Sequence, residues 1–249
     1  MLSLQKDRPE EEEEVEKLKI ILAQTIRSLA NVAPSVIEAH VTQFIGFLIN
    51  ILQNTSSLEL SLEIIKTLYA LFTQPKTVFE TNSVQNEELL HMFSYLTLIA
   101  TKHKNEELTV EVFKLMGCVG ALEQSDIVQN DEEQTKDDEM THEKNKFFWS
   151  SICNLLTGII SNEKDTTINS LAVSALVHIF CDTMLDTSVF EEFMITFVDK
   201  IEKEKGNYYL DQLTVLCVNI PYSCQRFGLE IMKVIKKIWD NQDTTVQKQ

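Results

Sequence analysis

The chain has 249 residues, of which 38 are Asp or Glu and 22 are Lys or Arg, so its formal net charge at pH 7 is -16. A surface this acidic repels the phosphates of nucleic acids and of anionic membranes, which excludes both as main ligands. With 6 glycines and 4 prolines, the chain also lacks the turn residues that a sheet protein of this length needs. The composition therefore predicts an all-α fold.

Two further features predict a cytoplasmic protein without integral membrane association. No apolar run approaches the roughly 18 residues of a membrane-spanning helix, and the N-terminal segment is acidic where a signal peptide would be basic and then apolar. The five cysteines lie in apolar helical stretches without a CxxC pair. Buried, reduced thiols are typical of an intracellular compartment.

The first part of the chain predicts an acidic tail over residues 1–12 and then three helices. The helix over Glu13–Asn31 has apolar residues at helical spacing and precedes Pro34, and its stripe is Val15, Leu18, Leu22, Ile26 and Leu29. Helices over Val36–Gln53 and Ser57–Thr73 follow. The latter is apolar on two faces, which indicates an internal helix of a layered array.

After a predicted loop at Gln74–Asn86, apolar periodicity continues to residue 240. The helices expected there are Glu87–His103, Glu106–Leu122, Phe147–Ile160, Asp165–Asp182, Ser188–Glu204, Tyr208–Ile220 and Tyr222–Asp240. Residues 123–145 hold nine acidic residues and few apolar ones, so this acidic insert is predicted to be disordered. Residues 241–249 are expected to form a C-terminal tail.

Grouped in pairs, the predicted helices repeat at a regular spacing over residues 13–240. The first helices of the pairs begin near positions 13, 57, 106, 165 and 208, and the longest interval contains the acidic insert. Repeats of roughly 40–47 residues are typical of HEAT and armadillo arrays. The sequence therefore favours a right-handed α-solenoid of about five helix pairs over a compact helical bundle.

No residue pattern in the chain indicates catalysis, a cofactor or a metal site. Phosphate-binding glycine loops, protein-kinase motifs and HExxH are absent from the sequence. Cys217 and Cys224 lie two helical turns apart, but zinc needs four ligands, so buried packing is the favoured interpretation. Gly117, Gly120 and Ala121 are interpreted as small residues that allow close helix packing rather than as a ligand site.

Two segments are candidates for binding a protein partner. Asp131, Glu132 and Glu133 belong to an acidic run that could dock a basic surface, although such runs are more often solvated. The aromatic triplet Phe147, Phe148 and Trp149 could anchor an interface if it is exposed. Core packing after the insert is the alternative for the triplet.

Several segments, in this order and spacing, resemble the HEAT region in the middle of the target of rapamycin (TOR) kinases, which belong to the phosphatidylinositol-3-kinase-related kinase family. The quoted segments are LKIILAQTI (Leu18–Ile26), FIGFLINILQNTSS (Phe44–Ser57), VFKLMGCVGALE (Val112–Glu123), the run Phe147–Phe180, and the sequence KKIW that ends at Trp239. The resemblance extends from about Glu14 to Asp240.

The resemblance implies a non-catalytic HEAT-repeat scaffold from a serine/threonine protein kinase whose kinase domain lies far C-terminal to this region. In that family, the region helps to hold the kinase dimer together and to dock the regulatory subunit raptor in growth signalling. Attachment to endomembranes would then arise through the parent complex. The alternative is a free-standing acidic HEAT adaptor or importin-like solenoid that binds basic protein segments.

Overall fold

The computed structural model describes residues 8–73, 91–98, 105–129, 151–162, 164–182, 187–204 and 207–246. Within these ranges all regular structure is helical. The chain divides into two compact units, Met1–Leu115 and Met116–Gln249. The helix α6 (Glu106–Gln129) contributes residues to both of them.

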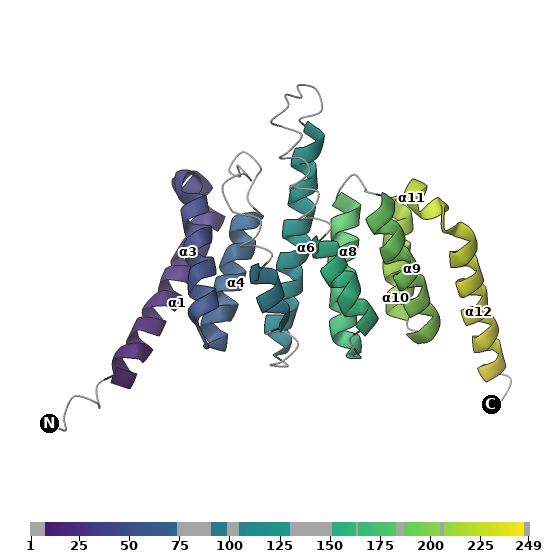
Figure 1. The fold of residues 1–249 in the computed structure, drawn as a ribbon, viewed down its shortest axis with the longest axis horizontal. Helices are drawn as coiled ribbons and strands as arrows, with labels where there is room; N and C mark the ends of the chain where they lie inside the picture. The colour runs from purple at the N-terminus through teal and green to yellow at the C-terminus, as the bar shows by residue number, and fades with distance from the viewer. Residues whose placement is uncertain are drawn as a thin grey trace. The chain divides into compact units, whose positions relative to one another are not determined.

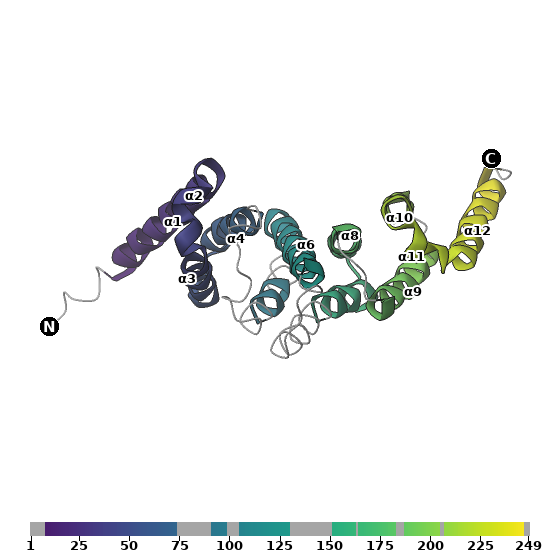
Figure 2. The ribbon, with the colours of Figure 1, turned by 90° about the horizontal axis from the view of Figure 1, so that it is seen from above.

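The first unit consists of helices packed side by side (Figures 1 and 2). Its helices before α6 are α1 (Arg8–Val32), α2 (Pro34–Ile37), the 3-10 helix η1 (Glu38–His40), α3 (Val41–Asn54) and α4 (Leu58–Phe72). Residues 91–98 are also helical. The helix α4 packs against both α1 and α3, so α1 and α4 touch although α3 separates them in sequence.

Local sequence explains the helix ends in this unit. The α1 helix begins at Arg8, five residues before the predicted start, because Pro9 is tolerated in a first helical turn and the glutamates that follow it favour the positive end of the helix dipole. The predicted helix Val36–Gln53 is instead three elements, α2, η1 and α3. Ser57 caps α4 by accepting a hydrogen bond from the Leu60 N–H at 3.3 Å.

The second unit repeats the same kind of packing. Its helices are the C-terminal part of α6, the helical residues 151–162, α8 (Thr166–Asp182), α9 (Thr187–Glu204), α10 (Asn207–Asn219), α11 (Pro221–Gln225) and α12 (Gly228–Val246). The helix α8 packs against α10, and α9 packs against α12. Figure 2 shows α8 and α10 on one side of this unit and α9 on the other.

An aromatic core joins α8, α9 and α10. Phe193 and Phe197 stack with their ring centroids 5.2 Å apart, and Phe180 lies 5.1 Å from Phe193. Tyr209 of α10 meets Phe197 edge to face at 6.2 Å. Since all four side chains are almost completely buried, they contribute apolar area and preferred ring geometry to the same core.

Helix bounds near the C-terminus differ from the prediction. The predicted helix Tyr222–Asp240 is two helices, since the chain turns at Arg226–Phe227 and starts again at Gly228. The final helix continues to Val246, so most of the predicted tail 241–249 is helical. In the same way α6 continues to Gln129, beyond the predicted start of the insert at Glu123.

The predicted all-α solenoid class is confirmed by the packing within each unit. Helices that are two positions apart in the order of the long helices touch one another, and this is how successive repeats share a core. The right-handed sense of the array stays a prediction. So do the number of helix pairs and the domain limits.

Candidate protein-interaction surfaces

The outer face of α1 is an exposed apolar stripe. Six large apolar side chains on this helix are between 36% and 84% exposed: Val15, Leu18, Ile21, Leu22, Leu29 and Val32. Four of them belong to the apolar stripe predicted for this helix, and only Ile26 of that stripe is buried. A row of exposed apolar side chains along one helix is a candidate interaction surface.

The side of α1 that the fold buries lies next to the exposed stripe. Ala23, Ile26 and Ala30 are at most 2% exposed, and α1 packs against α4. Alanines let the two helix backbones approach closely, so the helix turns its small residues inward and leaves its leucines outward. The apolar periodicity of α1 alone does not distinguish these two faces.

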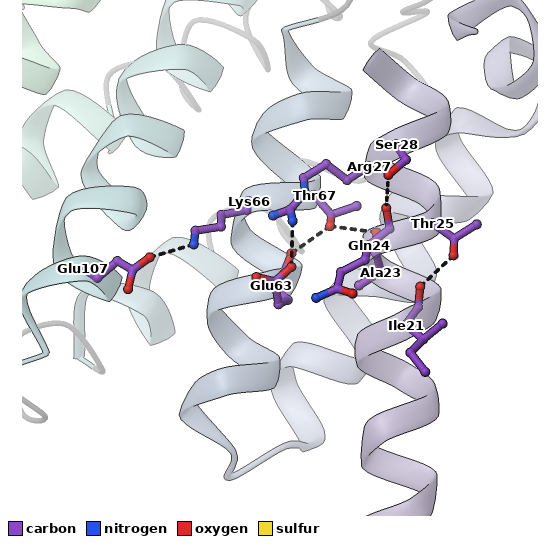
Figure 3. Close-up of polar contacts among 10 residues, drawn as sticks. All are labelled: Ile21, Ala23, Gln24, Thr25, Arg27, Ser28, Glu63, Lys66, Thr67 and Glu107. Carbon is purple, nitrogen blue, oxygen red and sulfur yellow. Dashed lines mark hydrogen bonds and ion pairs between the residues drawn. The ribbon is translucent and has the colours of Figure 1, made fainter. Parts of the chain in front are cut away.

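Polar contacts fasten α1 to α4 (Figure 3). The Thr67 hydroxyl, buried on α4, shares its hydrogen between the Ala23 carbonyl at 3.0 Å and the Glu63 carbonyl at 2.7 Å. Arg27 Nη2 lies 3.0 Å from Glu63 Oε2. That oxygen makes no hydrogen bond of good geometry with the described residues, so the contact between Arg27 and Glu63 is an attraction of charges.

A second ion pair joins α4 to α6. Lys66 Nζ lies 2.7 Å from Glu107 Oε1, and Glu107 is largely exposed. This pair is therefore well screened by water, unlike the largely buried Glu63 carboxylate. The contacts of Thr67 and Arg27 hold α1, with the apolar face that it presents, on α4, whereas the Lys66 pair joins α4 to α6.

The outer face of α12 is the second exposed apolar surface. Leu229, Met232, Ile235 and Trp239 are between 38% and 76% exposed. The inner face, formed by Ile231, Val234 and Ile238, is at most 9% exposed. The α12 helix thus carries apolar residues on two faces, of which packing against α9 covers one.

Apolar residues of α10 and α11 are also exposed near this end of the second unit. Val218 and Tyr222 are more than 70% exposed. The α10 helix is fixed from its other side, where the Tyr208 hydroxyl donates a hydrogen bond to the Ser170 carbonyl of α8 at 2.9 Å. Partial burial raises the pKa of Tyr208, so this hydroxyl stays protonated and able to donate.

The small residues predicted to pack lie at the contact of α6 with α8. A Cβ added to Gly117 would lie 3.2 Å from the Ala175 Cα, and one added to Gly120 would lie 2.6 Å from the Ile179 Cδ1. Ala121 is 8% exposed. In this part of α6 neither glycine leaves room for a ligand beside it.

The residues predicted to bind a partner lie outside the described part of the chain. This holds for Asp131, Glu132 and Glu133 and for Phe147, Phe148 and Trp149. Their roles stay predictions. The α1 and α12 faces described above were not identified as surfaces from the sequence, although α12 shows the same two-faced apolar pattern as Leu58–Phe72.

Three thiols come close together in the second unit. Burial raises the pKa of Cys224 to about 12, and the neighbouring Cys217 and Cys181 add to this shift. Burial also raises the pKa of Cys153. The cysteines are not joined by disulfides, and among the described residues no group of three His, Cys, Asp or Glu side chains could hold a metal ion.

Comparison with known proteins identifies the family. The family model described as "Serine/threonine-protein kinase mTOR domain" matches residues 84–232, which is more than half of the chain. No curated protein and no solved structure matches the chain. In the described ranges, no helix is long and apolar enough to cross a membrane. The chain therefore belongs to the family of the serine/threonine-protein kinase mTOR domain, which confirms its resemblance to a region of the TOR kinases.

Proposed function

We propose that the chain is a non-catalytic HEAT-repeat scaffold of a TOR-type serine/threonine protein kinase. The observation that carries this proposal is the family match over residues 84–232. The helical packing supports it, because an array of this kind presents long surfaces to partners. The exposed apolar faces of α1 and α12 supply such surfaces.

The finer role that we propose is to hold a second kinase chain and to dock a raptor-type regulatory subunit, as the family resemblance implies. A scaffold of this type acts by holding its partners in defined positions. Its helices are held by buried side chains and by contacts such as Arg27–Glu63, so a partner bound on an outer face has a defined place. The expected location is the cytoplasm.

Co-precipitation from the cells in which the protein occurs tests this role. The tagged natural protein is expected to retain a raptor-type subunit and a second, differently tagged copy at about 0.15 M salt. Retention of neither would contradict the proposed scaffold role. The pure chain is expected to turn over no nucleotide, and measurable turnover would show that it is an enzyme.

The net charge of -16 favours a second candidate function, an acidic adaptor that binds basic protein segments as importin-like solenoids do. The salt dependence of binding separates the two candidates. Affinity for a basic peptide that falls steeply between about 0.05 and 0.5 M salt would indicate gripping by charge, because salt at these concentrations screens exposed charges. Binding of a subunit through a packed apolar interface is expected to change little over the same range.

A further inference from the structure

Three cysteines of the second unit lie on helices that pack together. Cys181 is in the last turn of α8, Cys217 is in the last turn of α10, and Cys224 is in α11. The helix α10 packs against α8 and contacts α11. Since short connections join α9 to both α8 and α10, these two helices run in the same direction, and their C-terminal ends lie at the same end of the unit.

The chain bends between Cys217 and Cys224. In a continuous helix, residues seven apart have Cα atoms about 10 Å apart, which is too far for a disulfide. Here Ile220 leaves the helical backbone, with φ -130° and ψ 57°, and Pro221 begins α11. The Ile220 N–H donates to the Leu216 carbonyl at 2.8 Å, and the Cys224 N–H donates to the Ile220 carbonyl at 3.2 Å. Backbone hydrogen bonds on both sides of Ile220 therefore hold the bend in place.

The Cys217 thiol lies within hydrogen-bonding range of the Cys224 thiol. Burial raises the pKa of Cys224 most, and Cys217 adds to the shift through its charge and through a side-chain hydrogen bond. Cys181 adds to it through charge alone. Cys217 is thus the nearer neighbour, and rotation of the two side chains from this range can bring their sulfur atoms to the roughly 2 Å of an S–S bond.

The two sulfur atoms differ in their access to solvent. Cys217 is half-buried, whereas Cys224 is only 4% exposed. A small oxidant from solution therefore reaches Cys217 first, because the oxidation of a thiol depends on its exposure. The raised pKa of Cys224 keeps this buried thiol protonated at neutral pH, so it does not start the reaction.

We propose that Cys217 and Cys224 form a redox-active dithiol that hydrogen peroxide converts to a disulfide. This inference goes beyond the proposed scaffold function and does not depend on it. It is carried by the bend at Ile220, the contact of the two thiols and their unequal access to solvent. Disulfides of intracellular proteins are usually transient, so the reduced pair is the resting form.

The reaction has two steps. The Cys217 sulfur attacks one oxygen of hydrogen peroxide, the O–O bond breaks, and the other oxygen leaves as water with the thiol proton, so that Cys217 becomes a sulfenic acid. The Cys224 sulfur then attacks the Cys217 sulfur, the S–O bond breaks, and hydroxide leaves with the Cys224 proton as a second water. The two thiols together lose two electrons, which reduce the peroxide to water. Glutathione reverses the change by thiol–disulfide exchange.

The disulfide closes a ring of the chain that carries exposed apolar side chains. Val218 and Tyr222 lie between the two cysteines in the sequence and are more than 70% exposed. A covalent bond from α10 to α11 fixes the angle between these helices, and with it the spacing of these two side chains. The oxidation state of the dithiol therefore sets the shape of this part of the surface.

Peptide mapping of the full chain after treatment with hydrogen peroxide tests the proposal. Remaining thiols are first blocked with N-ethylmaleimide in denaturant. The tryptic peptide 206–226 contains Cys217 and Cys224 and no other cysteine. It is expected to lose two hydrogen atoms and to take up no N-ethylmaleimide. Chymotryptic cleavage after Tyr222 should then give two fragments that separate only on reduction.

Single substitutions separate the roles of the cysteines. In Cys224→Ala the reaction should stop at the sulfenic acid, so dimedone should label Cys217 at least fivefold more than in the natural chain. In Cys217→Ala, peroxide should leave the Cys224 thiol unchanged. Cys181→Ala is the matched control at the third cysteine of the cluster and should form the disulfide as the natural chain does. Circular dichroism should show that every variant keeps its helical content.

Three results would overturn the proposal. The first is a peptide 206–226 that keeps both thiols in the presence of peroxide. The second is oxidation of Cys217 while Cys224 stays a thiol, and the third is a disulfide from either residue to Cys181. All three are read from the natural chain, so they decide the matter even if a variant fails to fold. Co-precipitation of a raptor-type subunit tests the scaffold function separately.

Discussion

The backbone of α6 at Gly120 lies so close to Ile179 of α8 that a Cβ at position 120 would be 2.6 Å from the Ile179 Cδ1. One helical turn earlier, Gly117 faces the Ala175 backbone at 3.2 Å. The first neighbour is the end of a side chain and can move, whereas the second is main chain and cannot. The two glycines therefore tolerate added atoms differently.

Substitution of these glycines should reveal the close helix contact. Gly117→Leu and Gly120→Leu should both lower the free energy of unfolding, by about 1–3 kcal/mol, because the added atoms overpack a filled interface. The larger loss is expected at Gly117, where the neighbour is main chain. Urea denaturation followed by circular dichroism measures the change. Gly46 of α3 is the control site, because a Cβ added there would meet no atom within 4 Å. Gly46→Ala should stabilise the chain by up to about 1 kcal/mol.

The ion pair between Arg27 and Glu63 should contribute more to stability than the one between Lys66 and Glu107. Arg27→Met leaves a largely buried carboxylate without its cation and should cost about 1–3 kcal/mol. Lys66→Met leaves only the exposed Glu107 unpaired and should cost roughly 0–1 kcal/mol. Adding Glu63→Gln to Arg27→Met should recover part of the loss. Equal costs for Arg27→Met and Lys66→Met would contradict this ranking.

Two adjacent residues of α12, one buried and one exposed, should differ in how much their truncation to alanine lowers stability. Ile238 is buried within the second unit, so Ile238→Ala should cost about 2–4 kcal/mol in unfolding free energy. Trp239 is 68% exposed, and Trp239→Ala should change the unfolding free energy by less than about 0.5 kcal/mol. Thermal and urea unfolding measure both. A large loss at Trp239 would mean that its face is covered within the chain.

Stability should fall at alkaline pH because of the buried thiols. Burial raises the folded-state pKa of Cys224 to about 12 from an ordinary value of 9.0, so the folded chain holds this proton where the unfolded chain releases it. The stabilisation is thus complete below pH 9 and is lost progressively as the pH rises to about 12. Urea midpoints at several pH values in this window measure the effect.

Cys224→Ala is the comparison that isolates this thiol. The variant should lose less stability than the natural chain between pH 9 and 12, since it has no proton to release at this position. Groups that titrate in the window and lie away from Cys224 affect both chains equally. Parallel pH curves for the two chains would show that Cys224 is not protected in the folded state.

The sequence by itself determined the helical class and the position of the helices. Apolar residues recur with a helical period through most of the chain, and glycine and proline are too scarce for sheet turns. The helices α4, α8, α9 and α10 begin and end within a residue or so of their predicted limits. Where polar residues could either continue or end a helix, as at Glu123–Gln129, the limits differed.

Only the tertiary structure decided which face of each helix is buried. In α1, both Val15, Leu18 and Leu22 and the set Ala23, Ile26 and Ala30 recur at helical spacing, so either set could face the core. Packing of α4 against α1 buries the second set. The proximity of Cys181, Cys217 and Cys224 likewise depends on how α8, α10 and α11 pack. A local period defines a stripe on one helix, whereas burial depends on a neighbour that is distant in the sequence. That is why the outer faces of α1 and α12 emerge as surfaces only in the folded chain.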